Sequence, residues 1–347
     1  MTDVTPTTPA TTVANSSATT VANSSATTVA NSSATTVAIS GATAAADSPA
    51  EVTRCGSVAI VGAPNAGKST LVNALVGQKV AIVSAKVQTT RTRLIGIATE
   101  GAAQLLLIDT PGIFAPRRRL DRAMVRAAWE GAEGADLIAF VVDAKTGFRD
   151  DATAILESLA NRPEPKLLVL NKVDITAKTR LLELAAHANA FASFADTYFV
   201  SAGTGDGVAE LKAAFAAAMP ESPWHFPEDQ LTDATTRLMA AEITREQIYN
   251  QLHAELPYAS AVETEKWEER RDGSIAIHQQ ILVERDTQRA IVLGKGGSRL
   301  KEIGTTARAG IAELTGKKVH LFLHVKVKED WSEDRAVYRD SGLGWVD

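Results

Sequence analysis

Short apolar runs alternate with stretches of helical spacing over residues 55–220. The apolar runs are residues 57–61, 94–97, 105–108, 137–142, 167–170 and 198–200. Continuous apolar runs of this length, separated by helices, are typical of strands buried on both faces of a mainly parallel sheet. In such sheets, ligands bind beyond the carboxyl ends of the strands. The pattern therefore predicts an α/β domain with helices on both faces of its sheet.

This pattern changes at residues 220–227, which hold three prolines together with Trp224 and Phe226 and predict a linker. Helical spacing then runs from Leu231 to Leu256, and strands are expected afterwards. Their predicted ranges are 261–267, 274–283 and 319–327. We therefore predict a tail at 1–54, a first domain at 55–220, a linker at 221–231 and a second domain at 232–347.

The predicted tail is built from a repeated octapeptide. Thr-Thr-Val-Ala-Asn-Ser-Ser-Ala begins at Thr11 and recurs at Thr19 and Thr27, with a partial copy at Thr35. The repeats carry almost no charge, no aromatic residues and no large aliphatic residues, so they cannot bury enough surface to offset the entropy of ordering. We predict that this segment is disordered.

Composition and charge exclude several classes of protein. The formal net charge is −5, so a surface for nucleic acid has to be local. Cys55 is the single cysteine, which excludes an intrachain disulfide and a cysteine-rich zinc site and fits a reducing compartment. No apolar run approaches the ~20 residues of a membrane helix, and the N-terminus lacks a signal-peptide pattern. We expect a cytoplasmic protein.

A glycine-rich loop follows the first apolar run and precedes a helical stretch. It consists of Gly62, Ala63, Pro64, Asn65, Ala66, Gly67, Lys68, Ser69 and Thr70. Strand, glycine loop and helix form the context of a Walker A phosphate loop, whose backbone N–H groups surround the phosphates. Lys68 is expected to reach the β- and γ-phosphates, and the Ser69 hydroxyl to ligate Mg²⁺. We infer that the chain binds a nucleoside triphosphate.

A second motif lies at the end of the strand 105–108. It consists of Asp109, Thr110, Pro111 and Gly112. The carboxylate is expected to hold Mg²⁺, usually through water, opposite Ser69, and the Gly112 amide to contact the γ-phosphate. A polar segment at 88–93 is expected to supply a Thr hydroxyl that closes the Mg²⁺ shell when the γ-phosphate is bound. We assign this role to Thr90, with Thr89 as the alternative and a plain polar loop as the remaining interpretation.

A third motif predicts guanine as the base. It consists of Asn171, Lys172, Val173 and Asp174, after the strand 167–170. The N1–H and N2–H₂ groups of guanine both donate hydrogen bonds that a buried Asp174 carboxylate can accept, whereas adenine presents no such pair. Asn171 is expected to tie this loop to the phosphate loop, and Lys172 to lay its stem along the purine. The amide of Ala202, after Ser201, is expected to donate to guanine O6.

The groups that would activate water are incomplete near Gly112. Ile113 stands where Ras-like enzymes place a Gln that orients the attacking water. Residues 117–119 are three arginines, which either neutralise charge at the site or form a solvated face or partner contact. Asn65 is a candidate for helping to hold a monovalent cation such as K⁺. We expect slow intrinsic turnover.

The second domain contains a glycine-rich loop of another kind. The sequence Gly294-Lys295-Gly296-Gly297 fits the GxxG loop of a KH module, which clamps a single-stranded nucleic-acid backbone between two short helices. Residues 289–328 hold nine Lys and Arg against two Glu, so the local basic patch is present. Nucleic-acid contacts are expected from Gly294, Lys295, Gly296, Gly297, Arg299 and Lys301.

Together these motifs resemble the Era family of bacterial GTPases. The resemblance covers roughly residues 55–347, all but the tail. It includes the three motifs of the first domain, the segment 88–91, the GxxG loop and shorter stretches at 226–229, 255–258, 281–285 and 324–328. It implies a P-loop, Ras-like GTPase domain followed by an α+β type II KH domain, with GTP, GDP and Mg²⁺ as ligands.

The same resemblance implies partners and a cellular role. Era proteins bind near the 3′ end of small-subunit (16S) ribosomal RNA, act in maturation of the small ribosomal subunit and associate peripherally with the inner membrane. No DNA and no obligate protein partner is expected. We hypothesise that GTP orders Thr90 and Gly112 and thereby changes how the KH domain grips RNA. Two alternatives stay open: a nucleotide-sensing RNA-binding module with negligible hydrolysis, and a Ras-like signalling switch that acts on proteins.

Overall fold

The computed structural model of the chain describes residues 52–86, 88–91, 93–253, 256–335, 338 and 343–346. The disorder predicted for the repeats falls on residues 1–51, which lie outside the described residues, as does residue 255 of the matched stretch 255–258. In the described part of the chain, no helix combines the length and the apolar character needed to cross a bilayer.

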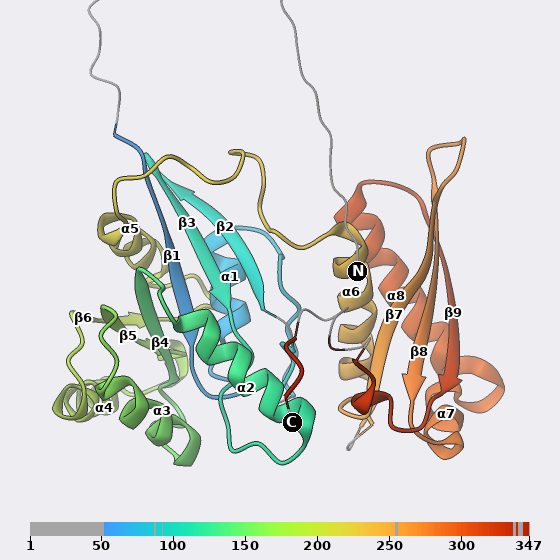
Figure 1. Cartoon of the computed structure of the whole chain (residues 1–347), viewed down its shortest axis with the longest axis horizontal. Helices are drawn as coiled ribbons and strands as arrows, with labels where there is room; N and C mark the ends of the chain where they lie inside the picture. Colours follow the sequence, from blue (N-terminus) through green and yellow to red (C-terminus); the bar gives the residue numbers. More distant parts are fainter. Residues whose placement is uncertain are drawn as a thin grey trace, which may run out of the picture. The chain divides into compact units, whose positions relative to one another are not determined.

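The first domain is built on a six-stranded sheet with the order β2-β3-β1-β4-β5-β6 (Figure 1). Its strands are β1 Arg54–Val61, β2 Leu94–Glu100, β3 Ala103–Asp109, β4 Leu137–Asp143, β5 Lys166–Asn171 and β6 Asp196–Val200. The pair β2–β3 is antiparallel and all other neighbours are parallel. This is the mainly parallel sheet that the apolar runs predict.

Helices cover both faces of this sheet. They are α1 Lys68–Val76, α2 Arg119–Ala132, α3 Asp150–Ala160, α4 Lys178–Phe191 and α5 Val208–Ala218. Helices α1 and α5 pack on one face, where Leu71 and Phe215 contact the side chains of Val58 and its neighbours. Helices α2, α3 and α4 pack on the other face, around Ala59 and Phe140. Alternate residues of one strand thus enter two separate cores, as expected for a buried strand.

The register of the strands brings the predicted motifs to one edge. Ile60 pairs with Asp109, and Asp143 pairs with Asn171. Because the strands run parallel, the loop after β1, the residues after β3 and the residues after β5 all leave the sheet at its carboxyl end. The site is therefore assembled by sheet topology from motifs that are far apart in the sequence.

The segment between the domains is held along the edge of the sheet. Trp224 Nε1 donates to the Ala102 carbonyl at 3.0 Å, and the backbone amides of His225 and Phe226 donate to the buried Gln104 side chain. Ile97 N donates to the Leu231 carbonyl at 2.8 Å. The segment that the prolines predict as a linker therefore has fixed contacts with β2 and β3.

The second domain has three strands and three long helices. They are α6 Thr236–Gln251, β7 Ser260–Glu269, β8 Ile275–Val283, α7 Asp286–Leu293, α8 Ser298–Thr315 and β9 Val319–Val327. The sheet order is β7-β8-β9, with β7–β8 antiparallel and β8–β9 parallel. Helices α6, α7 and α8 cover one face of this sheet, where Ile248, Ile281 and Ile303 share a core. The arrangement confirms the predicted α+β type II KH fold.

Helix α6 is shorter than the predicted helix at 231–256. The Thr235 side chain accepts a hydrogen bond from Leu238 N and caps the helix, so the helix begins at Thr236. Upstream, Asp233 N donates to the Ile95 carbonyl, and the Asp233 carboxylate accepts from Ile95 N. These residues pair with β2 instead of extending the helix.

Candidate functional site

The phosphate loop has the backbone that its glycines predict. Gly67 has a φ of 93°, and a Cβ there would lie 2.2 Å from Asn171 Nδ2. A Cβ on Gly62 would lie 2.3 Å from the Val141 carbonyl oxygen. Both positions therefore require glycine. The resulting loop lines a cavity together with Lys68, Ser69 and Thr70 from the start of α1 and with Gly112 from across the site.

Lys68 occupies the position of a phosphate-binding cation. Its side chain is buried, and Nζ donates to the carbonyls of Gly62 and Ala63 at 3.1 Å each. Burial lowers the pKa of Lys68 to about 8, although the charge of Asp109 opposes the change. A bound phosphate would offer Nζ an anionic partner in place of two neutral carbonyls.

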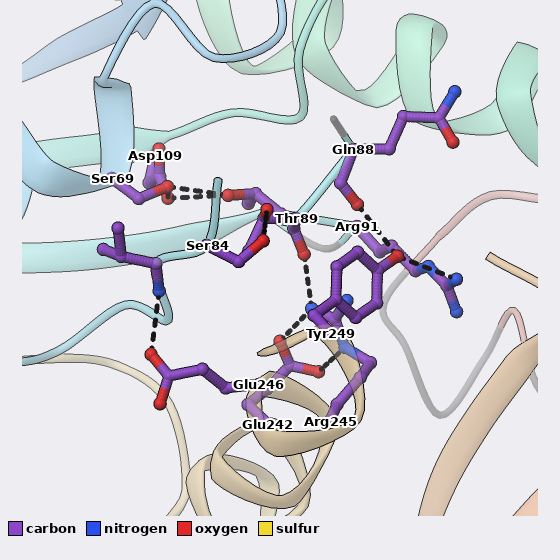
Figure 2. A network of polar contacts seen from close by, with 12 residues as sticks. Ser69, Ser84, Gln88, Thr89, Arg91, Asp109, Glu242, Arg245, Glu246 and Tyr249 are labelled. Atoms are coloured by element: carbon purple, nitrogen blue, oxygen red, sulfur yellow. Dashed lines mark hydrogen bonds and ion pairs between the residues drawn. The ribbon is translucent and has the colours of Figure 1, made fainter. Parts of the chain in front are cut away.

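Three side-chain oxygen atoms lie close together at the start of α1, two of them from Ser69 and Asp109, which Figure 2 labels. Ser69 Oγ lies 2.7 Å from Thr90 Oγ1 and donates to Asp109 Oδ2 at 2.7 Å, and Thr90 Oγ1 lies 3.3 Å from the same carboxylate oxygen. Asp109 Oδ1 is buried and has no hydrogen-bond partner among the described residues. Burial raises the pKa of Asp109, while hydrogen bonds from Ser69 and the charge of Lys68 oppose the rise. Two hydroxyls and a partly satisfied carboxylate are hard oxygen donors that fit Mg²⁺.

The structure distinguishes between the two threonines proposed for the metal site. Thr90 contacts Ser69 and Asp109, as described above, whereas Thr89 Oγ1 lies 2.8 Å from Ser84 Oγ and donates to the Lys86 carbonyl. The Thr89 side chain thus contacts residues 84 and 86 of its own loop, and the Thr90 side chain contacts the starts and ends of elements across the site. Of the two threonine hydroxyls, that of Thr90 is the one that lies beside Ser69 and Asp109.

Residues 109–113 run past the phosphate loop. Thr110 Oγ1 donates to the Ile60 carbonyl at 2.7 Å, and Ile113 N donates to the Gly62 carbonyl at 3.2 Å. A Cβ on Gly112 would lie 2.9 Å from Pro64 Cα, so glycine lets the two loops touch. The Ile113 side chain is buried in the core with α2 and α3 and offers no polar group to water.

Asn171 connects the base-side loops to the phosphate loop. Its Nδ2 donates to the Ala66 carbonyl at 2.8 Å, and its Oδ1 accepts from the amides of Lys172 and Ala202. The predicted tie to the phosphate loop is therefore present. The Ala202 amide, expected to donate to guanine O6, donates to Asn171 at 3.0 Å because that oxygen is the nearest acceptor. A guanine would have to share this amide. Ser201, before it, is buried.

Lys172 and Asp174 stand at the mouth of the base site. Lys172 has a φ of 67°, and its Nζ donates to the Asn65 carbonyl at 2.8 Å and pairs with Asp143 at 2.7 Å. The sequence predicts a buried carboxylate at Asp174, but this residue is exposed in the structure. Its carboxylate would become buried only beneath a bound base. Val173 begins a short 3₁₀ turn that carries Asp174.

The GxxG loop of the second domain is open to solvent. Gly294, Gly296 and Gly297 all have positive φ, and a Cβ on Gly296 or Gly297 would meet nothing within 4 Å. A Cβ on Gly294 would lie 2.7 Å from that of Arg299. Lys295 and Lys301 are exposed, and Arg299 lies 3.5 Å from Glu302. The loop between α7 and α8 thus presents glycine backbone beside several cations.

Two family models match the two domains separately. A model described as a 50S ribosome-binding GTPase matches residues 57–172, and a KH-domain model matches residues 255–332. The GTPase Era of Erythrobacter litoralis (strain HTCC2594) is 60% identical over 300 residues, which are 85% of this chain and 99% of that protein. The chain belongs to the Era family of GTPases. The GTPase Era of Bradyrhizobium sp. (strain BTAi1) is 59% identical over 295 residues, 85% of this chain and 96% of that protein.

Solved structures of Era proteins have the same fold over the same length. Era in complex with MgGDPNP and nucleotides 1506–1542 of 16S ribosomal RNA superimposes with a TM-score of 0.80 at 36% identity, covering 84% of this chain and 99% of that one. A variant of Aquifex aeolicus Era bound to GDP and aluminium fluoride gives 0.79 at 36% identity and the same coverage.

Sequence reasoning missed four residues of this Era-family site. Asp143 was visible as a polar residue at a strand end, but no motif around it signalled the ion pair with Lys172. Arg91 received no role of its own, although its side chain is only 8% exposed. Arg245 and Tyr249 lie on α6, where their spacing is that of ordinary helix residues. All four are defined by partners from distant parts of the chain.

Proposed function

We propose that this Era-family GTPase binds the 3′ region of small-subunit ribosomal RNA and assists maturation of the small ribosomal subunit. The observation that carries the proposal is the exposed, cation-flanked GxxG loop in a chain that matches, over 84% of its length, an Era protein solved with 16S ribosomal RNA nucleotides. A KH loop with glycine at its tip lets a phosphate approach the main chain closely.

The roles of the chain's own residues in hydrolysis follow from their positions. Lys68 neutralises the phosphates, and the amides of the phosphate loop surround them. Ser69, Thr90 and Asp109 are placed to hold Mg²⁺, which supplies positive charge to the phosphate oxygens when it is bound. Because Ile113 faces the core, the side chain after Gly112 does not orient water. This arrangement supports slow hydrolysis in the absence of a further activating group.

The membrane and cellular setting extend this proposal. The proposed target in ribosomal RNA supports a cytoplasmic location, and the family resemblance supports peripheral contact with the cytoplasmic face of the inner membrane. It also favours RNA over DNA as the nucleic-acid ligand, with no obligate protein partner. K⁺ beside Asn65 belongs to the same proposal. The Asn65 backbone has a φ of 62°, and its side-chain Nδ2 donates to the Ala85 carbonyl at 3.4 Å.

A double substitution in the GxxG loop tests the proposal. Lys295→Asp with Gly296→Asp places two carboxylates where RNA phosphates would approach, and we expect affinity for an RNA matching the 3′ end of 16S ribosomal RNA to fall at least about 100-fold. Binding of GDP should be unchanged. Lys317→Asp is the matched control, because it adds negative charge at an exposed position beyond the far end of α8.

Two results would favour the alternatives. Specific RNA binding that survives the double substitution would place the RNA contacts outside the GxxG loop and contradict the role proposed for it. Binding that does not differ between matching and scrambled RNA would favour a switch that acts on proteins. GTP turnover that stays negligible with and without the matching RNA would instead favour a nucleotide-sensing RNA-binding module.

A further inference from the structure

The segment that carries Thr90 is held by helix α6 of the KH domain. Val83 N donates to Glu246 at 3.0 Å, and Lys86 Nζ donates to the carbonyls of Tyr249 and Leu252. Tyr249 Oη donates to the Gln88 carbonyl at 3.3 Å. These contacts join residues 83–88 of the first domain to a helix that lies more than 150 residues later in the chain.

Arg91 is the most deeply inserted part of this segment. Its guanidinium donates to the carbonyls of Ser260, Pro257 and Tyr258 at 2.7, 3.2 and 3.0 Å, and to Tyr249 Oη at 3.1 Å. All four acceptors are neutral and all belong to the KH domain. A buried cation keeps its charge only if such partners replace water, so removing the guanidinium removes the whole attachment.

Arg245 holds the neighbouring carbonyl from the helix side (Figure 2). Its Nη2 donates to the Thr89 carbonyl at 2.6 Å, and Glu242 accepts from the same guanidinium. The Arg245 side chain is 3% exposed, and its guanidinium lies 5.2 Å from the centre of the Tyr249 ring. Helix α6 therefore presents a fixed cation to the backbone of the segment.

These contacts flank Thr90 on both sides. The carbonyl of Thr89 is bound by Arg245, the side chain of Arg91 is bound by the β7 end of the KH domain, and Thr90 between them points the other way, toward Ser69 and Asp109. We propose that Arg91 and Arg245 are positioning residues for the GTP site, so that the KH domain helps to place the Thr90 hydroxyl at the metal position. The GTP site is thus completed by both domains.

The consequence differs between the two nucleotides. Thr90 closes the Mg²⁺ shell only when a γ-phosphate is present, so a displaced Thr90 weakens GTP binding and leaves GDP binding intact. By thermodynamic reciprocity, the γ-phosphate must then also favour this arrangement of α6 against the segment. The effect of the γ-phosphate on α6 links the positioning role to control of RNA binding and therefore rests on the proposed function. The effect of Thr90 on GTP binding does not rest on it.

Nucleotide affinity measured on the full chain without RNA tests the positioning role. For Arg91→Met we expect affinity for a non-hydrolysable GTP analogue with Mg²⁺ to fall about tenfold, with GDP affinity within about twofold of the original. Arg91→Lys restores charge but not the four-bond geometry, so it should recover only part of the loss. Arg237→Met is the matched control, because Arg237 lies on α6 and, among the described residues, its side chain donates to the carbonyls of Thr264 and Glu265 in β7 and not to the segment around Thr90.

Hydrogen exchange of the free protein gives a second readout that needs no nucleotide. Amides of residues 83–91 should exchange faster in Arg91→Met and Arg245→Met, and at the original rate in Arg237→Met. In a Thr90→Ala background, Arg91→Met should cause no further loss of GTP-analogue affinity, because its effect passes through Thr90. If Arg91→Met proves too unstable to purify, Tyr249→Phe removes a single hydroxyl from the same cluster, and a smaller loss of the same kind is expected.

Two results would overturn the positioning role. One is an equal fall of GTP-analogue and GDP affinity, which would show a general structural defect. The other is an Arg91→Met effect that adds fully to that of Thr90→Ala. Since RNA is absent from both experiments, a failure here leaves the proposed RNA target standing, and the absence of RNA binding would leave the positioning role standing.

Discussion

Lys68 carries its charge in a place from which water is largely excluded. Its ammonium has two neutral carbonyls as its hydrogen-bond partners, and burial brings its pKa down to about 8. A bound phosphate favours the charged form, so nucleotide binding must raise this pKa again. The free energy of binding is then linked to proton uptake by one side chain.

Proton uptake on GDP binding should therefore increase with pH between about pH 6.5 and pH 8. At about pH 6.5 Lys68 is already protonated in the free protein, so GDP binding should take up almost no proton there. At about pH 8 half of the free protein has a neutral Lys68, so uptake should approach about half a proton per nucleotide and affinity should fall with further rise in pH. Calorimetry in two buffers of different ionisation enthalpy measures this. Proton release at pH 8, or no exchange, would contradict the pKa shift.

The connecting segment between the domains is an element whose order depends on Gln104. This buried side chain accepts hydrogen bonds from the amides of His225 and Phe226 and donates to the Phe226 carbonyl at 2.9 Å. Trp224 and Phe226 also pack beside Ile97 at the edge of the sheet. The Gln104 amide thus adds three hydrogen bonds to the contacts of Trp224 and Ile97 that hold the chain as it leaves the first domain.

Replacing Gln104 therefore has a predictable cost. Gln104→Ala leaves two backbone amides and one carbonyl without their partner, and we expect the free energy of unfolding to fall by about 2–4 kcal/mol. Denaturant unfolding followed by fluorescence measures the change. Gln78→Ala, at an exposed residue after α1, is the control and should stay within about 0.5 kcal/mol of the original protein. Equal stability of the two variants would show that the segment is held by its apolar contacts alone.

Helix α6 shows which features of an element can be predicted from sequence. The apolar spacing predicted that a helix exists there. The same spacing also includes Leu231 and Ala234, but these residues pack against the core of the first domain, and the helix begins only at Thr236. Strand β9 had the predicted bounds, because its limits are set by its own apolar run. Local patterns therefore predicted the elements, and contacts between domains set the boundaries that the pattern missed.

In the GTP site, too, contiguous motifs could be predicted from the sequence, whereas contacts between distant residues could not. The phosphate loop, residues 109–112 and residues 171–174 are contiguous motifs, so their chemistry can be inferred wherever they occur, and the sheet topology accounts for their meeting. The surroundings of Arg91 could not be inferred, because a basic residue in a polar segment has the same local pattern whether it is solvated or buried. Its acceptors lie beyond residue 248, and only the fold brings them together.

Two parts of the first domain that adjoin the GTP site, the residues around Thr90 and helix α2, contact residues of the C-terminal half of the chain. The segment 83–91 is bound by α6, as described above. Helix α2, which follows residues 109–113, packs against Tyr338 and Leu343, and Arg119 at its start pairs with Glu333. The three arginines at 117–119 are therefore divided in role, since residues 117 and 118 are exposed while Arg119 makes a contact across the chain.

Under the proposed function, these contacts would offer a route from the nucleotide to the RNA surface. A γ-phosphate that held Thr90 and Gly112 would also restrain the segments that contact α6 and the C-terminal residues, and a domain held in one arrangement loses less conformational freedom when RNA binds. The formal net charge of −5 means that general electrostatic attraction to RNA is weak, and the basic stretch at 289–328 is the local exception. A difference in RNA affinity between nucleotide states should therefore report on that stretch.

Nucleotide state and RNA binding should therefore be linked in this chain. The most direct measurement is the affinity of the full protein for an RNA matching the 3′ end of 16S ribosomal RNA, at one fixed salt concentration, with a GTP analogue and Mg²⁺, with GDP, and without nucleotide. We predict at least about fivefold tighter binding with the GTP analogue than with GDP, and a smaller difference in Arg91→Met. Equal affinity in all three states of the unmodified protein would contradict the account.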